Sequence, residues 1–219
     1  MIFNLPNILT VFRLIAAPLV PLVFLFVMRP YADWIALVLF ASASITDWFD
    51  GYLARSWNQT TKLGTMLDPI ADKAMVVTAL MTLTALYGVS FWILVPAVVI
   101  MFRETFVSGL REYLGDTAGT LKVTKLAKWK TTVQMLAVSV LLAHGIFEHY
   151  VGMSSFGMDG NTFDGIISGE IEDVIGLRWK YLAYRISSDV GVALLWVAAF
   201  LTLITGWDYF RKATTHLKD

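Results

Sequence analysis

Long apolar stretches alternate with short polar intervals along the whole chain. The apolar stretches cover about residues 8–28, 34–54, 64–87, 91–113, 131–147 and 187–207. At about 1.5 Å per residue, a helix needs roughly 20 residues to cross the hydrocarbon layer of a membrane. The pattern therefore predicts an all-α, polytopic membrane protein with six transmembrane helices, the third of them beginning between Gly64 and Pro69.

Two of the polar intervals differ sharply in charge. Residues 114–130 are basic, whereas residues 148–173 carry six acidic residues and neither lysine nor arginine. The acids are irregularly spaced and match no EF-hand pattern. We therefore expect an extramembrane acidic loop over about residues 148–183. Arg178, Lys180 and Arg185 then come before the sixth span.

Composition and charge narrow the class of protein. The chain of 219 residues is 57% hydrophobic with a mean hydropathy of +0.66, above the apolar content of soluble domains. Its 17 basic and 17 acidic residues cancel, which gives no net field for a nucleic-acid partner. The chain has no cysteine, which excludes thiolate metal sites and cysteine nucleophiles. With no internal repeat, a single domain over residues 1–219 is expected.

The basic residues also predict an orientation in the lipid bilayer. Six spans place both termini on one side. If that side is the cytoplasm, Arg55, Lys62, the basic interval and the tail all lie there, as the positive-inside rule requires. The facing ends of the second and third spans then meet the cytoplasm.

Four aspartates lie between the apolar parts of the second and third spans: Asp47, Asp50, Asp68 and Asp72. A carboxylate at the edge of a membrane is costly unless it is paired, hydrated or bound to a cation. Residues three and four apart share a helix face, so each pair forms one stripe, and the two stripes can converge. Hard oxygen ligands in this number suit Mg²⁺ or Mn²⁺.

Residues beside the aspartates fit a phosphate ligand. Gly51, Ala54 and Gly64 lack side-chain bulk and allow close approach, and Arg55 offers a planar fork for phosphate. Two metal ions on carboxylates would neutralise a diphosphate, and a nearby carboxylate could accept a proton from an attacking hydroxyl. The stretch therefore favours phosphoryl chemistry over a structural role.

The first span carries a second polar stripe. Asn7, Thr10 and Arg13 recur at three-residue spacing and lie on roughly one face. Arg13 has two interpretations of equal weight: it extends to the membrane surface, or it points into the aspartate pocket.

The pattern Asp47-x2-Asp50-Gly51-x2-Ala54-Arg55-x8-Gly64-x3-Asp68-x3-Asp72 resembles the complete signature of the CDP-alcohol phosphotransferase family. The resemblance implies a six-helix enzyme, often a homodimer, in a bacterial cytoplasmic membrane with its active site facing the cytoplasm. It implies that the four aspartates hold two ions of Mg²⁺ or Mn²⁺ and that Asp72 is the general base. It implies that Gly51, Ala54, Arg55 and Gly64 shape the site of the CDP-bearing donor. We add three polar residues to this donor site: Asn7, Thr10 and Thr65.

The family signature leaves the acceptor alcohol open, but other segments bear on it. The opening residues 4–13, residues 103–111 and residues 128–134 resemble the branch that forms phosphatidylglycerol phosphate from CDP-diacylglycerol and glycerol 3-phosphate. That acceptor is a dianion, and the cations expected to bind its phosphate are Arg103, Arg111, Lys128 and Lys130. The simpler alternative is that these cations hold anionic headgroups.

Three other functions stay open. One is the same chemistry on inositol phosphate, serine or a lipid alcohol. The others are a membrane prenyltransferase and a divalent-cation transporter.

Overall fold

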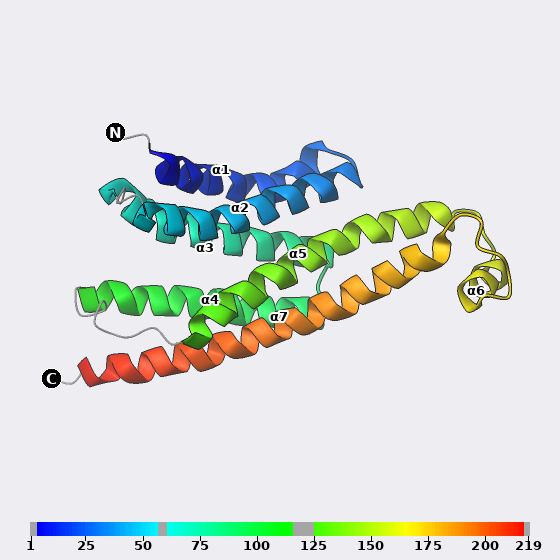
Figure 1. Ribbon diagram of the computed structural model, residues 1–219. Coiled ribbons are helices and arrows are strands. Elements are labelled where there is room, and N and C mark those ends of the chain that lie inside the picture. Colours follow the sequence, from blue (N-terminus) through cyan, green and yellow to red (C-terminus); the bar gives the residue numbers. More distant parts are fainter. Residues whose placement is uncertain (1–3, 57–60, 116–124, 217–219) are drawn as a thin grey trace. The chain divides into compact units, whose positions relative to one another are not determined.

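The computed structural model describes residues 4–56, 61–115 and 125–216, and side chains there except those of residues 48–56, 125, 127, 128 and 216 (Figure 1). In these ranges the chain is helical and contains no strand. The helices are α1 (Leu5–Phe26), α2 (Tyr31–Ser56), α3 (Lys62–Leu86), α4 (Phe91–Leu114), α5 (Lys125–Ser154), α6 (Gly160–Ser168), α7 (Leu177–Ala213) and the 3-10 helix η2 (Thr214–His216). The all-α prediction is confirmed.

Five of these helices are long and apolar enough to cross a membrane: α1, α3, α4, residues 129–154 of α5, and α7. Helix α2 has 26 residues, which is also enough to cross a membrane. Large apolar side chains such as Leu25, Phe102 and Phe200 are more than half exposed, as lipid-facing residues would be. The chain is a multi-pass membrane protein, and the six predicted spans correspond to α1–α5 and α7.

Several helix boundaries differ from those expected. Helix α5 continues to Ser154 and α7 begins at Leu177, so both helices enter the interval assigned to a loop over residues 148–183. Arg178, Lys180 and Arg185 therefore lie on α7 and do not precede it. Apolar length alone underestimates such helices, because their polar ends extend beyond the hydrocarbon layer.

The segment between α5 and α7 is organised by its acids. Asp159 caps α6 by accepting a hydrogen bond from the Thr162 amide, at 3.2 Å. Asp173 accepts hydrogen bonds from the amides of Leu177 and Arg178, at 2.7 and 2.8 Å, which satisfies the first turn of α7. These amide bonds favour the ionised carboxylate and lower the pKa of Asp173.

Replacing Asp173 with alanine is expected to lower the thermal midpoint at pH 7 by about 2–4 °C, because α7 loses its capping group. The folded-state pKa is depressed, so the stabilisation is present above the unfolded pKa and is lost as the pH falls through the folded pKa. Thermal unfolding in detergent at pH 7 and pH 3 measures the difference in midpoint between Asp173→Ala and the wild type at each pH. Asp164→Ala, in the same segment, is the matched control. An equal difference at both pH values would contradict the capping role of the ionised carboxylate.

The contacts divide the chain into two compact units. Unit 1 comprises Met1–Ala79 and Ser139–Gly191, and unit 2 comprises Leu80–Val138 and Val192–Asp219. In unit 1, α1 packs on α2, and small residues of these two helices such as Ala17 and Ala36 are fully buried. In unit 2, Leu83, Ile100 and Leu195 are fully buried. The single-domain assignment stays a prediction.

Candidate functional site

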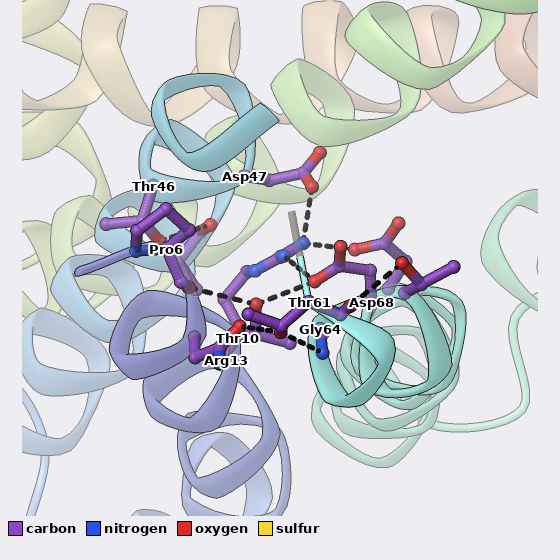
Figure 2. A network of polar contacts seen from close by, with 12 residues as sticks. Pro6, Thr10, Arg13, Thr46, Asp47, Thr61, Gly64 and Asp68 are labelled. Carbon is purple, nitrogen blue, oxygen red and sulfur yellow. Dashed lines mark hydrogen bonds and ion pairs between the residues drawn. The ribbon is translucent and has the colours of Figure 1, made fainter. Parts of the chain in front are cut away.

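Arg13 of α1 lies at the centre of a polar network in unit 1 (Figure 2). Its side chain is 2% exposed, and its guanidinium forms ion pairs with carboxylates of both neighbouring helices. Nη1 contacts Asp47 of α2 and Asp72 of α3, and Nη2 lies 3.3 Å from Asp68 of α3. Of the two interpretations of Arg13, the structure shows the one in which the side chain points into the aspartate pocket.

The three carboxylates contact Arg13 on one side and are open on the other. Side-chain exposure is 37% for Asp47, 46% for Asp68 and 47% for Asp72. Thr10, one turn before Arg13 on α1, donates a hydrogen bond to Asp68 Oδ1 at 2.6 Å. The structure thus brings Asp47 of the first aspartate pair together with Asp68 and Asp72 of the second at one accessible, strongly anionic place. Asp50, Gly51, Ala54 and Arg55 belong to α2, but their side chains lie outside the described residues.

The start of α3 is fastened to the start of α1. The Thr61 hydroxyl donates to Asn7 Oδ1 at 2.8 Å and accepts from the Gly64 amide at 3.0 Å, the bond of a helix N-cap. A Cβ at Gly64 would lie 2.8 Å from Asn7 Oδ1, so a larger residue here would displace the Asn7 side chain. The cap explains why α3 begins at Lys62, earlier than the expected start between Gly64 and Pro69.

An open pocket of about 440 Å³ lies beside this cap and is lined by Thr61, Lys62, Thr65 and Met66. Thr65, one of the residues assigned to the donor, is exposed on it. Asn7 and Thr10, also assigned to the donor, are 7% and 2% exposed and meet the network from the α1 side. The described donor residues therefore gather where α1 and α3 begin.

Replacing Thr61 with valine should loosen the start of α3, because the hydrogen bonds of the Thr61 hydroxyl with the Gly64 amide and with Asn7 Oδ1 are lost. We expect faster hydrogen exchange in the peptide containing residues 61–66, with opening made easier by about 1 kcal/mol. Mass spectrometry of the exchanged protein measures this. Thr84→Val is the control, since Thr84 is a half-buried threonine near the end of α3 whose hydroxyl donates to the Met81 carbonyl of the same helix. Unchanged exchange in residues 61–66 would remove the capping role.

The carboxylate oxygens around Arg13 are ligands that suit a hard divalent cation. Oxygen atoms of Asp47, Asp68 and Asp72 reach the same small volume from two helices, and their partial exposure leaves room for water as further ligands. Among the side chains that the structure describes, no group of three acidic residues is already arranged as a metal site. The oxygens of Asp47, Asp68 and Asp72 contact the Arg13 guanidinium instead.

A second charged cluster lies in unit 2. Glu104 of α4 forms ion pairs with Lys130 of α5 and with Arg103, the latter at 3.3 Å. Arg103 Nη2 also lies 3.4 Å from the Thr205 hydroxyl of α7. Lys130 is 6% exposed, so this cation is held inside the unit and not in the solvent. Among the cations proposed for the acceptor, the structure brings Arg103 and Lys130 onto one carboxylate.

Arg111, two turns after Arg103 on α4, is exposed and stacks on another residue of α7. Its guanidinium carbon lies 5.3 Å from the ring centroid of Tyr209, a cation–π contact. The Tyr209 hydroxyl is buried and has no hydrogen-bond partner among the described residues. The side chain of Lys128 lies outside the described residues.

Residues of these sites that were not assigned from the sequence include Thr61, Glu104 and Tyr209. Thr61 carried a usable signal, because a threonine just before a helical run is a preferred N-cap. Glu104 stands next to Arg103, but only the tertiary fold shows that it also pairs with Lys130. Tyr209 lies just after the sixth apolar stretch and gave no signal.

Comparison with known proteins places the chain among enzymes of one kind. The family described as CDP-alcohol phosphatidyltransferase matches residues 3–204. A protein of Cereibacter sphaeroides is 52% identical over 99% of this chain and 98% of its own length. Proteins of Rickettsia bellii (38% identical, covering 95% of this chain and 94% of the relative) and Haemophilus influenzae (34%, 99% and 97%) also match. All three are named CDP-diacylglycerol–glycerol-3-phosphate 3-phosphatidyltransferase.

Proposed function

We propose that this chain, which belongs to the CDP-alcohol phosphatidyltransferase family, transfers the phosphatidyl group of CDP-diacylglycerol to glycerol 3-phosphate. The products are phosphatidylglycerol phosphate and CMP. The observation that carries the proposal is the convergence of Asp47, Asp68 and Asp72 at the edge of a helical membrane protein, in a chain 52% identical to a relative named for this reaction. A membrane-embedded site suits a lipid donor that moves within the bilayer.

The donor binds in unit 1. Asp47, Asp50, Asp68 and Asp72 would hold two ions of Mg²⁺ or Mn²⁺, which when bound supply positive charge to the diphosphate of the donor. Asn7, Thr10 and Thr65 offer hydrogen-bonding groups for the cytidine diphosphate moiety, with Gly51, Ala54, Arg55 and Gly64 completing the site. The open pocket beside Thr61 and Thr65 gives this moiety access.

Asp72 is the general base. Its side chain is 47% exposed, so the carboxylate can take the proton of the primary hydroxyl of glycerol 3-phosphate. The hydroxyl oxygen forms a bond to the lipid-side phosphorus, and the bond from that phosphorus to the oxygen of the CMP phosphate breaks. CMP leaves with the electron pair. Positioning and electrostatic stabilisation supply most of the rate, and no protein nucleophile is needed.

The cations of unit 2 bind the phosphate of the acceptor. Lys130 is buried and Arg103 is partly buried beside a single carboxylate, so their two positive charges exceed the charge of Glu104 by one. A surplus cation in a place of low exposure attracts a dianion more strongly than a solvated lysine would. Arg111 and Lys128 extend the same role. The alternative role, as holders of anionic headgroups, needs no burial.

We further propose that the protein is a homodimer in a bacterial cytoplasmic membrane, with the aspartates facing the cytoplasm. The bacterial sources of the relatives and the distribution of arginine and lysine support this placement.

Acceptor competition tests the proposed reaction. Purified protein with labelled CDP-diacylglycerol and equimolar glycerol 3-phosphate, inositol phosphate and serine should yield phosphatidylglycerol phosphate alone. A product with inositol phosphate or serine would reassign the acceptor. Release of pyrophosphate in place of CMP would indicate a prenyltransferase, and Mn²⁺ flux into vesicles without a cytidine nucleotide would indicate a transporter.

A further inference from the structure

Arg13 occupies the place where the three described aspartates converge. All three contacts use the Oδ1 atom of the aspartate, and Thr10 adds its hydroxyl to the Oδ1 of Asp68. Carboxylate oxygens are also the atoms that a divalent cation takes as ligands. The guanidinium and such a cation therefore need the same atoms.

The positive charge of Arg13 opposes the binding of a metal ion to the same carboxylates. One guanidinium faces three carboxylates, so the described group retains two negative charges after pairing. A positive charge within ion-pair distance of the ligands opposes a second cation, because like charges repel strongly where water is partly excluded. Arg13 is 2% exposed, so bulk solvent screens its charge poorly.

The position of Arg13 on the buried face of α1 directs its side chain toward the aspartates. Asn7, Thr10 and Arg13 form one buried stripe, and the small residues Ala16 and Ala17 continue it toward the middle of the helix. The backbone of α1 thus holds the guanidinium against α2 and α3. An Arg13 side chain extended toward the membrane surface would instead lie in water.

We propose that Arg13 is an internal counter-cation that divalent metal ions must displace from Asp47, Asp68 and Asp72, so that Arg13 weakens metal binding while stabilising the protein without metal. The inference rests on the metal requirement of the proposed function. Arg13 is a positioning residue here: it acts through the carboxylates and not on the substrate. A purely structural ion pair predicts the opposite sign for metal affinity, because its loss would scatter the ligands and weaken binding.

The test is a titration of the purified protein with Mn²⁺, with free Mn²⁺ measured by electron paramagnetic resonance. Arg13→Gln should lower the Kd of Mn²⁺ by about tenfold or more, and Arg13→Lys should give an intermediate Kd because lysine keeps a positive charge but lacks the planar guanidinium fork. Lys73→Gln is the control, since Lys73 is an exposed cation next to Asp72 in sequence, and should change the Kd less than about twofold.

Thermal unfolding supplies a second readout. Without added metal, the midpoint of Arg13→Gln should lie below that of the wild type, and saturating Mn²⁺ should raise it by more than it raises the wild type. If Arg13→Gln does not fold without metal, Arg13→Lys carries the test alone.

Two outcomes would overturn separate claims. Equal or weaker Mn²⁺ binding by both Arg13 variants would overturn the counter-cation role and leave the proposed reaction intact. Absence of Mn²⁺ binding in every variant, together with transfer that continues in a chelator, would overturn the metal requirement itself.

Discussion

Asp72→Asn is expected to lower kcat for phosphatidyl transfer by about 10³-fold or more. An amide cannot accept the proton of the attacking hydroxyl, and general-base catalysis alone contributes about 10²–10⁴-fold. The loss of a metal ligand adds to the effect. Assays of CMP release with saturating CDP-diacylglycerol and glycerol 3-phosphate measure it, with expression and thermal midpoint recorded for the same preparation.

Asp208→Asn provides the matched control. Asp208 is a half-exposed aspartate of α7 that pairs with Lys212 one turn away, so its loss removes a carboxylate of similar exposure outside the proposed machinery. Its kcat should stay within about twofold of the wild type. Near-normal turnover in Asp72→Asn would remove Asp72 as the base.

Lys130→Ala should raise the KM for glycerol 3-phosphate by about 10- to 100-fold and change the KM for CDP-diacylglycerol much less. The expected size follows from the loss of one charge-assisted hydrogen bond to a phosphate, about 1.5–3 kcal/mol. Part of the effect comes from Glu104, which keeps Arg103 as a partner and then cancels its charge. Initial rates at varied acceptor and donor concentrations separate the two KM values.

Lys212→Ala removes a half-exposed lysine that also pairs with a carboxylate, and both KM values should stay unchanged. An increase confined to the KM of the donor in Lys130→Ala would move the cluster of unit 2 from the acceptor to the donor. Equal changes in both mutants would instead favour a general attraction of anionic lipid.

Much of the fold follows from apolar length, because six stretches near 20 residues leave few alternatives in a membrane. The ends of the helices do not follow from it. Helix α7 begins at Leu177 because Asp173 caps it, and α3 begins at Lys62 because Thr61 does. Both caps are short-range signals in polar sequence, where a search for apolar runs gives no weight to them.

The aspartate site was predictable as a set of residues but not as an arrangement. Periodicity placed Asp68 and Asp72 on one face of α3, and the same rule aligned Asn7, Thr10 and Arg13 on α1. Periodicity cannot say which face meets which helix, so the inward and outward directions of Arg13 stayed equal until its partners were known. The pairing of Lys130 with Glu104 depends on α4 and α5 together and has no counterpart in local sequence.

The most direct test of the proposed reaction is the product formed by purified protein from CDP-diacylglycerol and radiolabelled glycerol 3-phosphate. We predict one molecule of CMP for each molecule of labelled phosphatidylglycerol phosphate, with neither product formed when glycerol 3-phosphate is omitted. CMP release at an unchanged rate without glycerol 3-phosphate, or an unlabelled lipid product in its presence, would contradict the proposal.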